Sequence, residues 1–187
     1  MSNAANVTTG KRRVDGGIYF APAGTTLPTD ATTALATAFK NLGYVSEDGV
    51  TNSLSKETSE IKEWGGDTVD VVLTAQNDTF QFTLIESLNV DTLKAIYGSS
   101  NVTESSGAIT VTVNASEAPS GVYVIDMIMK GGALKRVVIP NGSMSELGEI
   151  VYKADEAIGY EITLNALPDS SGVTHYEYIK LAAAPST

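Results

Sequence analysis

Residues 68–98, TVDVVLTAQNDTFQFTLIESLNVDTLKAIYG, form the stretch that decides the fold. Apolar and polar residues alternate along most of it, and a period of two is typical of a half-buried strand. The apolar face of the first strand comprises Val69, Val71, Leu73 and Ala75, and that of the second comprises Phe80, Phe82 and Leu84. Asn77 and Asp78 lie between them, and because both tolerate positive φ they predict a tight turn. The stretch therefore predicts a β-hairpin.

A helix is predicted at the end of the same stretch, over about residues 89–97. Asn89 is suited to cap its first turn, and Gly98 accepts the left-handed conformation that ends many helices. The apolar residues between them follow a 3.6-residue period, at Val90, Leu93, Ile96 and Tyr97. A hairpin beside one amphipathic helix favours an α+β fold.

Composition narrows the class of protein. The chain has 187 residues, 42% of them hydrophobic, which suffices for one domain with a sizeable core. Twelve basic residues stand against 22 acidic ones, for a net charge of −10. This excess of acidic residues argues against a protein that binds nucleic acid tightly, because Lys and Arg are needed to neutralise the phosphates. No apolar run approaches the ~20 residues of a membrane span, and the N-terminus has no signal-peptide core.

The segment 46–66, SEDGVTNSLSKETSEIKEWGG, is long, polar and carries the one tryptophan, Trp64. A long connection of this kind in a compact domain is usually functional or disordered. Two interpretations stay open. The segment is a solvated loop whose Trp64 folds back onto its own domain, or it is a projecting arm. In the second case Ile61 and Trp64, with Glu57 nearby, contact a neighbouring molecule, because Trp is enriched among interface anchors.

Residues 122–129, VYVIDMIM, are apolar on both faces except for Asp126. Such a strand is normally covered on both sides, here by the core and by a helix or a neighbouring subunit. Asp126 has no partner that the sequence identifies. A returning strand is predicted to stop at Pro140, and 31–40 is predicted to form a short helical turn.

A long hairpin is predicted from 144–152 and 158–167, the second arm of which alternates strictly. Its polar positions carry Glu146, Glu149 and Glu161, which either solvate the outer surface or line a bore. With the other segments, the total is about ten strands and one helix. This predicts a mainly β (α+β) chain of two packed antiparallel sheets, a sandwich or barrel with a flanking helix. We expect an N-terminal arm at 1–15, one domain over 16–180 and a tail at 181–187.

Catalytic and metal-binding patterns are missing from the sequence. There is no cysteine, and the one histidine, His175, lies in a predicted strand. A zinc site of the usual kind needs more such ligands, and no GxSxG elbow, Walker loop or GxGxxG loop occurs. Asp155 and Glu156 are predicted at a hairpin tip without a calcium-loop pattern. The sequence predicts neither an enzyme nor a cofactor.

Five stretches covering most of 16–180 resemble the major tail tube proteins of long-tailed bacteriophages with non-contractile tails. They are GGIYFAPAGTTLPTDATTALATAFKNLGYVSEDGV (16–50), IKEWGGDTV (61–69), DTFQFTLIESLNVDTLKAIYG (78–98), GEIVYKADEAIGYEITLNALPD (148–169) and HYEYIK (175–180). None of them is a catalytic motif. The likeness lies in the residues of these stretches and in the order of the stretches along the chain.

The resemblance implies a structural protein of the virion, with a fold shared with the tube of type VI secretion systems. Hexameric rings of such subunits stack into a hollow tube that conducts the genome without binding it specifically. In the family a long loop reaches the next ring, which here corresponds to 46–66 and favours an interface role for Ile61 and Trp64. Expected partners are further copies, the tape measure, the tail tip and the terminator. Synthesis is expected in the host cytoplasm.

A binding module is the alternative from another class. A β-sandwich that recognises carbohydrate or protein usually exposes clustered aromatic side chains on one face. In this sequence the pair Tyr176 and Tyr178 is the one obvious candidate. Formation of rings or tubes by the purified chain would separate the two interpretations.

Overall fold

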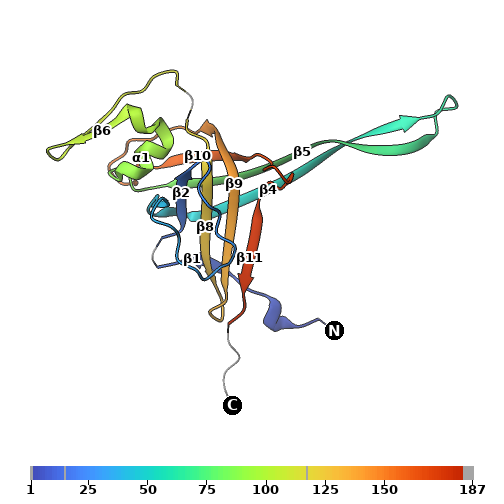
Figure 1. The fold of residues 1–187 in the computed structure, drawn as a ribbon, viewed down its shortest axis with the longest axis horizontal. Helices are drawn as coiled ribbons and strands as arrows, with labels where there is room; N and C mark the ends of the chain where they lie inside the picture. Colours follow the sequence, from blue (N-terminus) through green and yellow to red (C-terminus); the bar gives the residue numbers. More distant parts are fainter. Residues whose placement is uncertain (1, 15, 117, 183–187) are drawn as a thin grey trace, which may run out of the picture.

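The computed structural model describes residues 2–14, 16–116 and 118–182 (Figure 1). Most of the predicted C-terminal tail, 183–187, lies outside the described residues. The strands are β1 (Gly10–Arg12), β2 (Ile18–Pro22), β3 (Lys40–Asn41), β4 (Val45–Lys62), β5 (Thr68–Leu84), β6 (Val102–Ser105), β7 (Ala108–Val111), β8 (Gly121–Met129), β9 (Leu134–Leu147), β10 (Tyr160–Ala166) and β11 (Tyr176–Lys180). The helices are α1 (Val90–Tyr97) and the short 3-10 turns η1 (Ala4–Asn6) and η2 (Ser99–Asn101).

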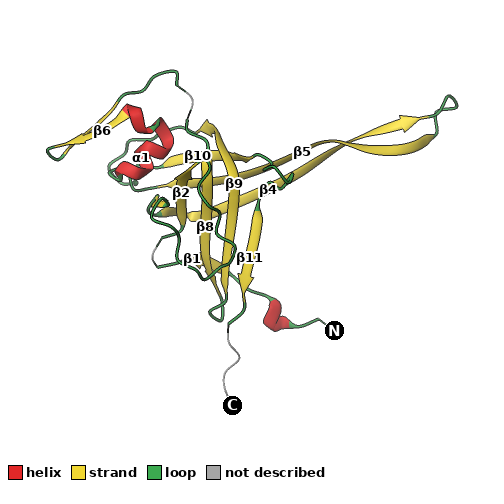
Figure 2. Cartoon of the chain, in the orientation of Figure 1, coloured by secondary structure: helices red, strands yellow, loops and turns green. Residues whose placement is uncertain are grey.

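The described chain is mainly β, with one α-helix beside the sheet, as the sequence predicts (Figure 2). Nine strands form one antiparallel sheet in the order β3-β2-β8-β9-β10-β5-β4, with β1 on β8 and β11 on β9. Strands β6 and β7 form a second, small sheet. Within the described residues the large sheet does not close into a barrel.

Strand β9 joins the two halves of the large sheet. One of its edges pairs with β8, while the other pairs first with β11, over 134–138, and then with β10, over 142–147. The prediction that Pro140 ends this strand was wrong. Pro140 lies between the two sets of partners, next to an irregularity in the β8 ladder, where a missing N–H is tolerated. The predicted 144–152 strand is therefore the end of β9, which stops at Leu147.

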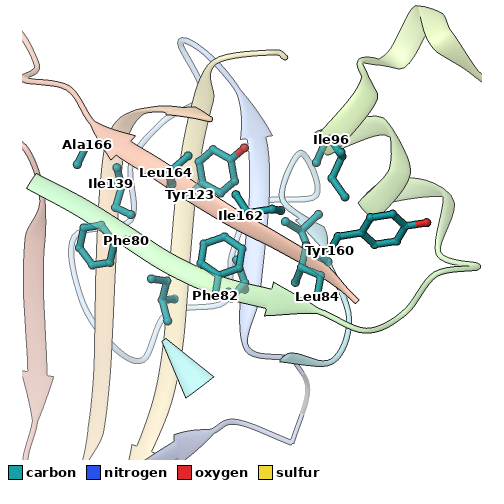
Figure 3. Packing of buried hydrophobic residues seen from close by; sticks show 14 of the residues in the cluster. Phe80, Phe82, Leu84, Ile96, Tyr123, Ile139, Tyr160, Ile162, Leu164 and Ala166 are labelled. Carbon is teal, nitrogen blue, oxygen red and sulfur yellow. The ribbon is translucent and has the colours of Figure 1, made fainter. Parts of the chain in front are cut away.

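The main core lies between β5, β10, the β8–β9 pair and α1 (Figure 3). It contains the predicted inner face of β5, namely Phe80, Phe82 and Leu84, all at most 3% exposed. From β10 the strictly alternating residues Tyr160, Ile162, Leu164 and Ala166 are buried against them. The amphipathic patterns thus predicted the correct faces of these strands.

Helix α1 agrees closely with its prediction. The Asn89 side chain accepts hydrogen bonds from the backbone N–H groups of Asp91 and Thr92. At the other end Gly98, with φ of +89°, donates its N–H to the Lys94 carbonyl. Leu93 and Ile96 are buried in the core, so the apolar stripe is what attaches the helix.

The second face of β8 is also buried, by the chain itself. Val122, Val124 and Val138 form a second apolar cluster with Ala21 and Phe39. Leu27, Leu35, Tyr176 and Tyr178 pack against this cluster. The expectation that a helix or a neighbouring subunit covers this face was wrong, and so was the helical turn at 31–40. An irregular segment of the same chain provides the cover.

Polar contacts fix that covering segment to the sheet. Arg136 is 1% exposed and donates to Asp126 from Nε (2.7 Å) and from a terminal nitrogen (2.8 Å). Its other terminal nitrogen donates to the carbonyls of Asp30 and Thr33, each at 2.9 Å. The Asp30 carboxylate accepts side-chain and backbone bonds from Thr33 and Thr32, which hold its pKa well below the usual range. Asp126 thus has the partner that the sequence left unidentified.

Candidate assembly surfaces

Strands β4 and β5 form one long hairpin that extends well beyond the body of the molecule (Figure 1). Segment 46–66, predicted as a projecting loop, does project, but mostly as strand β4. The turn predicted at Asn77 and Asp78 was wrong, because both residues lie inside β5, opposite Ser55 and Leu54. The turn is instead at 63–67, where Trp64 is fully exposed.

Asp78 is the reason that β5 continues through this point. It is 3% exposed and accepts hydrogen bonds from Asn52 (2.7 Å) and Thr174 (2.6 Å). His175 Nδ1 lies 2.6 Å from the same carboxylate, and the imidazole packs edge-on against Phe80. A buried carboxylate with three partners holds the base of the hairpin to the segment before β11. The single histidine is thereby engaged in a structural contact.

One face of the hairpin continues the core face of the sheet outward. Directly opposed residues share a face, and the series runs from Phe80, opposite Asn52, to Leu54, opposite Asp78, and then to Leu73 and Val71. Further out Val69 follows by alternation. These four apolar side chains, Leu54, Val69, Val71 and Leu73, are 50–62% exposed. We call them the apolar hairpin face. Lys56 and Gln76 lie between Leu54 and Leu73 on this face, and Thr58 and Glu60 are opposite Leu73 and Val71, so the apolar side chains form a row along β5 and not an unbroken patch. Exposed apolar side chains gathered on one face mark a candidate interaction site.

The predicted interface residues occupy different parts of the hairpin. Glu57 and Ile61 lie on the face opposite to the apolar hairpin face, since Ile61 is opposite Asp70 and Glu57 opposite Ala75. Trp64 lies at the tip. The structure therefore does not gather the three into one patch. The sequence did place Val69, Val71 and Leu73 on one face, but as a half-buried strand, and the structure shows them exposed.

A polar surface covers the outer face of four neighbouring strands. Its rows run straight across the ladder, the first through Thr51, Gln81, Thr163 and Glu146, and the second through Ser53, Thr79, Asn165 and Ser143. Glu161, opposite Thr83, accepts a hydrogen bond from Gln81 at 2.6 Å. We call this the polar sheet face. These ten residues include acids but no lysine or arginine.

Of the three acids predicted to line a bore, Glu146 and Glu161 thus share the polar sheet face. Glu149 lies beyond β9, in the exposed connection to β10. The sequence could place the first two on one face because β10 alternates. It could not place Glu149, since the predicted strand was too long.

Two strand edges in this region have no partner in the described residues. Strand β4 pairs with β5 alone, and the end of β9, 143–147, pairs with β10 alone. These edges bound the same four-stranded region, β9-β10-β5-β4, on opposite sides. Unpaired edges of this length are templates for pairing with another chain.

Other functional classes find little support in the described part of the chain. No group of three acidic or histidine side chains is placed to hold a metal ion there. Tyr176 and Tyr178 stack with centroids 6.3 Å apart, but they are half-buried over the second core cluster. Tyr176 also donates to Asp169 at 2.8 Å, which lowers the pKa of that carboxyl. This pair is part of the packing and does not form a free aromatic platform.

None of the helices in the described residues has the length and apolar character needed to cross a membrane. Comparison with protein families found a match to the model described as phage tail tube protein, over residues 4–187. Comparison with curated proteins found no match.

Proposed function

Because the chain belongs to the phage tail tube protein family, we propose that its copies close into hexameric rings that stack into a hollow tube for the genome. Family membership makes it a structural component of the virion tail that works by self-assembly, and it implies a non-enzymatic protein. The proposal adds three points: that the copies form a ring, that the ring has six copies, and that the tube delivers DNA. The number six comes from the resemblance of the sequence to tail tube proteins.

The observation that carries the proposal is the pair of unpaired edges on one four-stranded region. In a ring, the β4 edge of one copy pairs with the 143–147 edge of the next. The region has an even number of antiparallel strands, so a rotation about the ring axis brings these edges together antiparallel. Repetition closes the four-stranded regions into a continuous barrel and leaves neither of these two edges exposed.

The polar sheet face is the surface that this barrel turns toward its bore. Its opposite face is buried in the core, so it is the one face of these strands available to line a channel. Hydroxyl, amide and carboxylate groups without any cation offer phosphates no binding site, and DNA can pass without adhering. Glu146 and Glu161 are the acids that we assign to the bore. Glu57 lies further along the same side of β4.

Rings stack when the hairpin of each copy contacts the adjacent ring. The apolar hairpin face supports this role because it has no cover in the described chain. Tape measure, tail tip and terminator proteins are proposed to contact the ends of the tube. Residues 16–180 are proposed as the unit that forms the ring, with 1–15 and 181–187 as arms that bridge subunits.

Electron microscopy of the purified protein over a concentration series, with light scattering for mass, tests the proposal. Rings or hollow tubes are expected, with or without added tail tips as initiators. A chain that stays monomeric even with tail tips would overturn the proposal. Glycan binding by that monomer would then favour the carbohydrate-binding module.

Reversal of the bore charge is expected to make assembled tubes retain DNA. In the double variant Glu146→Lys, Glu161→Lys each copy gains two cations on the polar sheet face, which can neutralise phosphates. Binding should fall steeply with salt. Co-sedimentation of tubes with linear DNA measures the effect. Glu104→Lys, on the small β6–β7 sheet, is the matched control and should bind no more DNA than wild type. Equal retention by that control would contradict the assignment of the bore.

Truncation of Trp64 is expected to impair ring stacking without harming the monomer. The indole is fully exposed, so Trp64→Ala should change the free energy of unfolding by less than about 0.5 kcal/mol. The measurements are urea unfolding of the monomer and the length of tubes in micrographs. Loss of the monomer fold would show that Trp64 is part of the core.

A further inference from the structure

We propose that the hairpin tip of one copy inserts Trp64 into a lysine-flanked hollow at the β8–β9 turn of another copy. This inference rests on the proposed function, because it names the surface that receives the hairpin. It extends that function by identifying both sides of the contact.

The inserting side is a rigid, acidic turn with one large apolar side chain. Glu63 donates its N–H to the Asp67 carbonyl and accepts the N–H of Gly66 at its own carbonyl, both at 2.9 Å. This closed turn presents Trp64, 104% exposed, at its apex. Residues 60–70 contain four acids and one lysine, and that lysine is already paired with Glu60. A preordered aromatic group loses little entropy on docking.

The receiving side is a hollow of about 420 Å³ between β1 and the β8–β9 turn. Ile128 and Met129 supply apolar surface, and Gly10, Gly131 and Gly132 leave its wall without side chains. Lys11 and Lys130 stand at its margin, both exposed. The Lys130 N–H donates to the Thr9 carbonyl at 2.9 Å, which ties β1 to the turn. Met sulfur and lysine ammonium groups are both favourable neighbours for an indole ring.

Charge distinguishes this hollow from the other candidates on the described surface. A hollow of similar size beside β4 contains Glu47, Asp48 and Asp126, and another contains Glu86. Two smaller ones include Glu161 or Glu86. Of these five, the hollow at the β8–β9 turn is the one that carries lysines and no acid. Arg12 offsets an acid in two of the other hollows, and Lys11 a second acid in one of them, but none of the four has an excess of cations. An acidic tip is therefore attracted most strongly to the hollow at the β8–β9 turn.

The contact must join two copies. Figure 1 places the tip of the hairpin at the far end of the molecule from the β8–β9 turn. The nine residues 54–62 of β4 alone span roughly 30 Å, enough to reach across to a neighbour.

Cysteine cross-linking tests the contact directly, because the chain contains no cysteine. Gly65→Cys and Thr9→Cys are made as single variants, mixed in equal amounts, assembled and oxidised. Neither variant alone should form this cross-link, and the mixture should give a disulfide dimer on a non-reducing gel. Leu88→Cys, exposed beside the hollow that contains Glu86, is the control partner for Gly65→Cys. We expect at least tenfold less dimer with it.

Charge exchange provides a second test. Two double variants are made. One reverses the hollow, by Lys11→Glu with Lys130→Glu, and the other reverses the tip, by Glu63→Lys with Asp67→Lys. Each double variant should raise the protein concentration needed for assembly about tenfold. Combined in one chain, the four changes should restore assembly to within threefold of wild type. Failure of the combination to recover would overturn the docking.

Different results would overturn the docking of Trp64 and the assembly of the chain into tubes. If the chain forms tubes but Gly65→Cys does not cross-link to Thr9→Cys, or cross-links better to Leu88→Cys, the docking alone is overturned. Absence of tubes for the wild type, even with tail tips, would overturn the proposed function and the docking with it.

Discussion

Replacement of Asp126 by alanine is expected to lower the free energy of unfolding by about 3–5 kcal/mol. The change leaves the Arg136 guanidinium buried at 1% exposure without its carboxylate. An uncompensated buried charge is costly, and Arg13, whose nitrogen is 3.5 Å from Asp126, loses a partner as well. The covering segment held by Arg136 should loosen from β8. Urea unfolding followed by circular dichroism measures the loss.

The matched control is an ion pair that includes Lys135, the residue next to Arg136 on β9, and Glu177 on β11. Lys135 and Glu177 form an ion pair at 2.6 Å, but both side chains are partly exposed. Glu177→Ala should therefore cost at most about 1 kcal/mol. The double replacement Asp126→Leu, Arg136→Met should cost less than Asp126→Ala, since no fully buried charge is left unpaired. Equal losses for Asp126→Ala and Glu177→Ala would contradict the structural role of the buried pair.

Leu73→Asp is expected to abolish tube assembly while the monomer stays folded. Leu73 is 51% exposed in the centre of the apolar hairpin face, so an aspartate there remains hydrated in the monomer. In an assembled contact that carboxylate would be buried without a partner, at a cost of about 3 kcal/mol per copy. Such a cost raises the concentration needed for assembly roughly 100-fold. Analytical sedimentation over a concentration series measures it.

Ser55→Asp is the control for this substitution. Ser55 lies on the same hairpin but on the opposite face, across from Asn77, where neighbouring residues are polar. Its assembly should stay within a few-fold of wild type. If both aspartates blocked assembly equally, the loss would be due to added charge and would not identify the apolar hairpin face as the contact.

Local patterns were enough to predict the elements whose signals lie within a few residues. The alternation in β10 and in the inner half of β5 identified their buried faces, and Asn89 with Gly98 bounded α1. Two of the three acids predicted as candidates for a bore, Glu146 and Glu161, could be placed on one face for the same reason. The family resemblance was likewise present in the run of residues, and the family comparison confirmed it.

The sequence by itself thus determined which residues face inward on the regular strands, where the one α-helix begins and ends, and that no metal or catalytic motif is present. Tertiary structure alone decided the remainder. Asp78 lies in a strand, and not in a turn, because Thr174 and His175, 96 and 97 residues away, bond to it. Asp126 tolerates burial because Arg136 folds back across the β8–β9 ladder. Periodicity is set by adjacent residues, whereas a buried polar group is stable only when distant segments supply its partners.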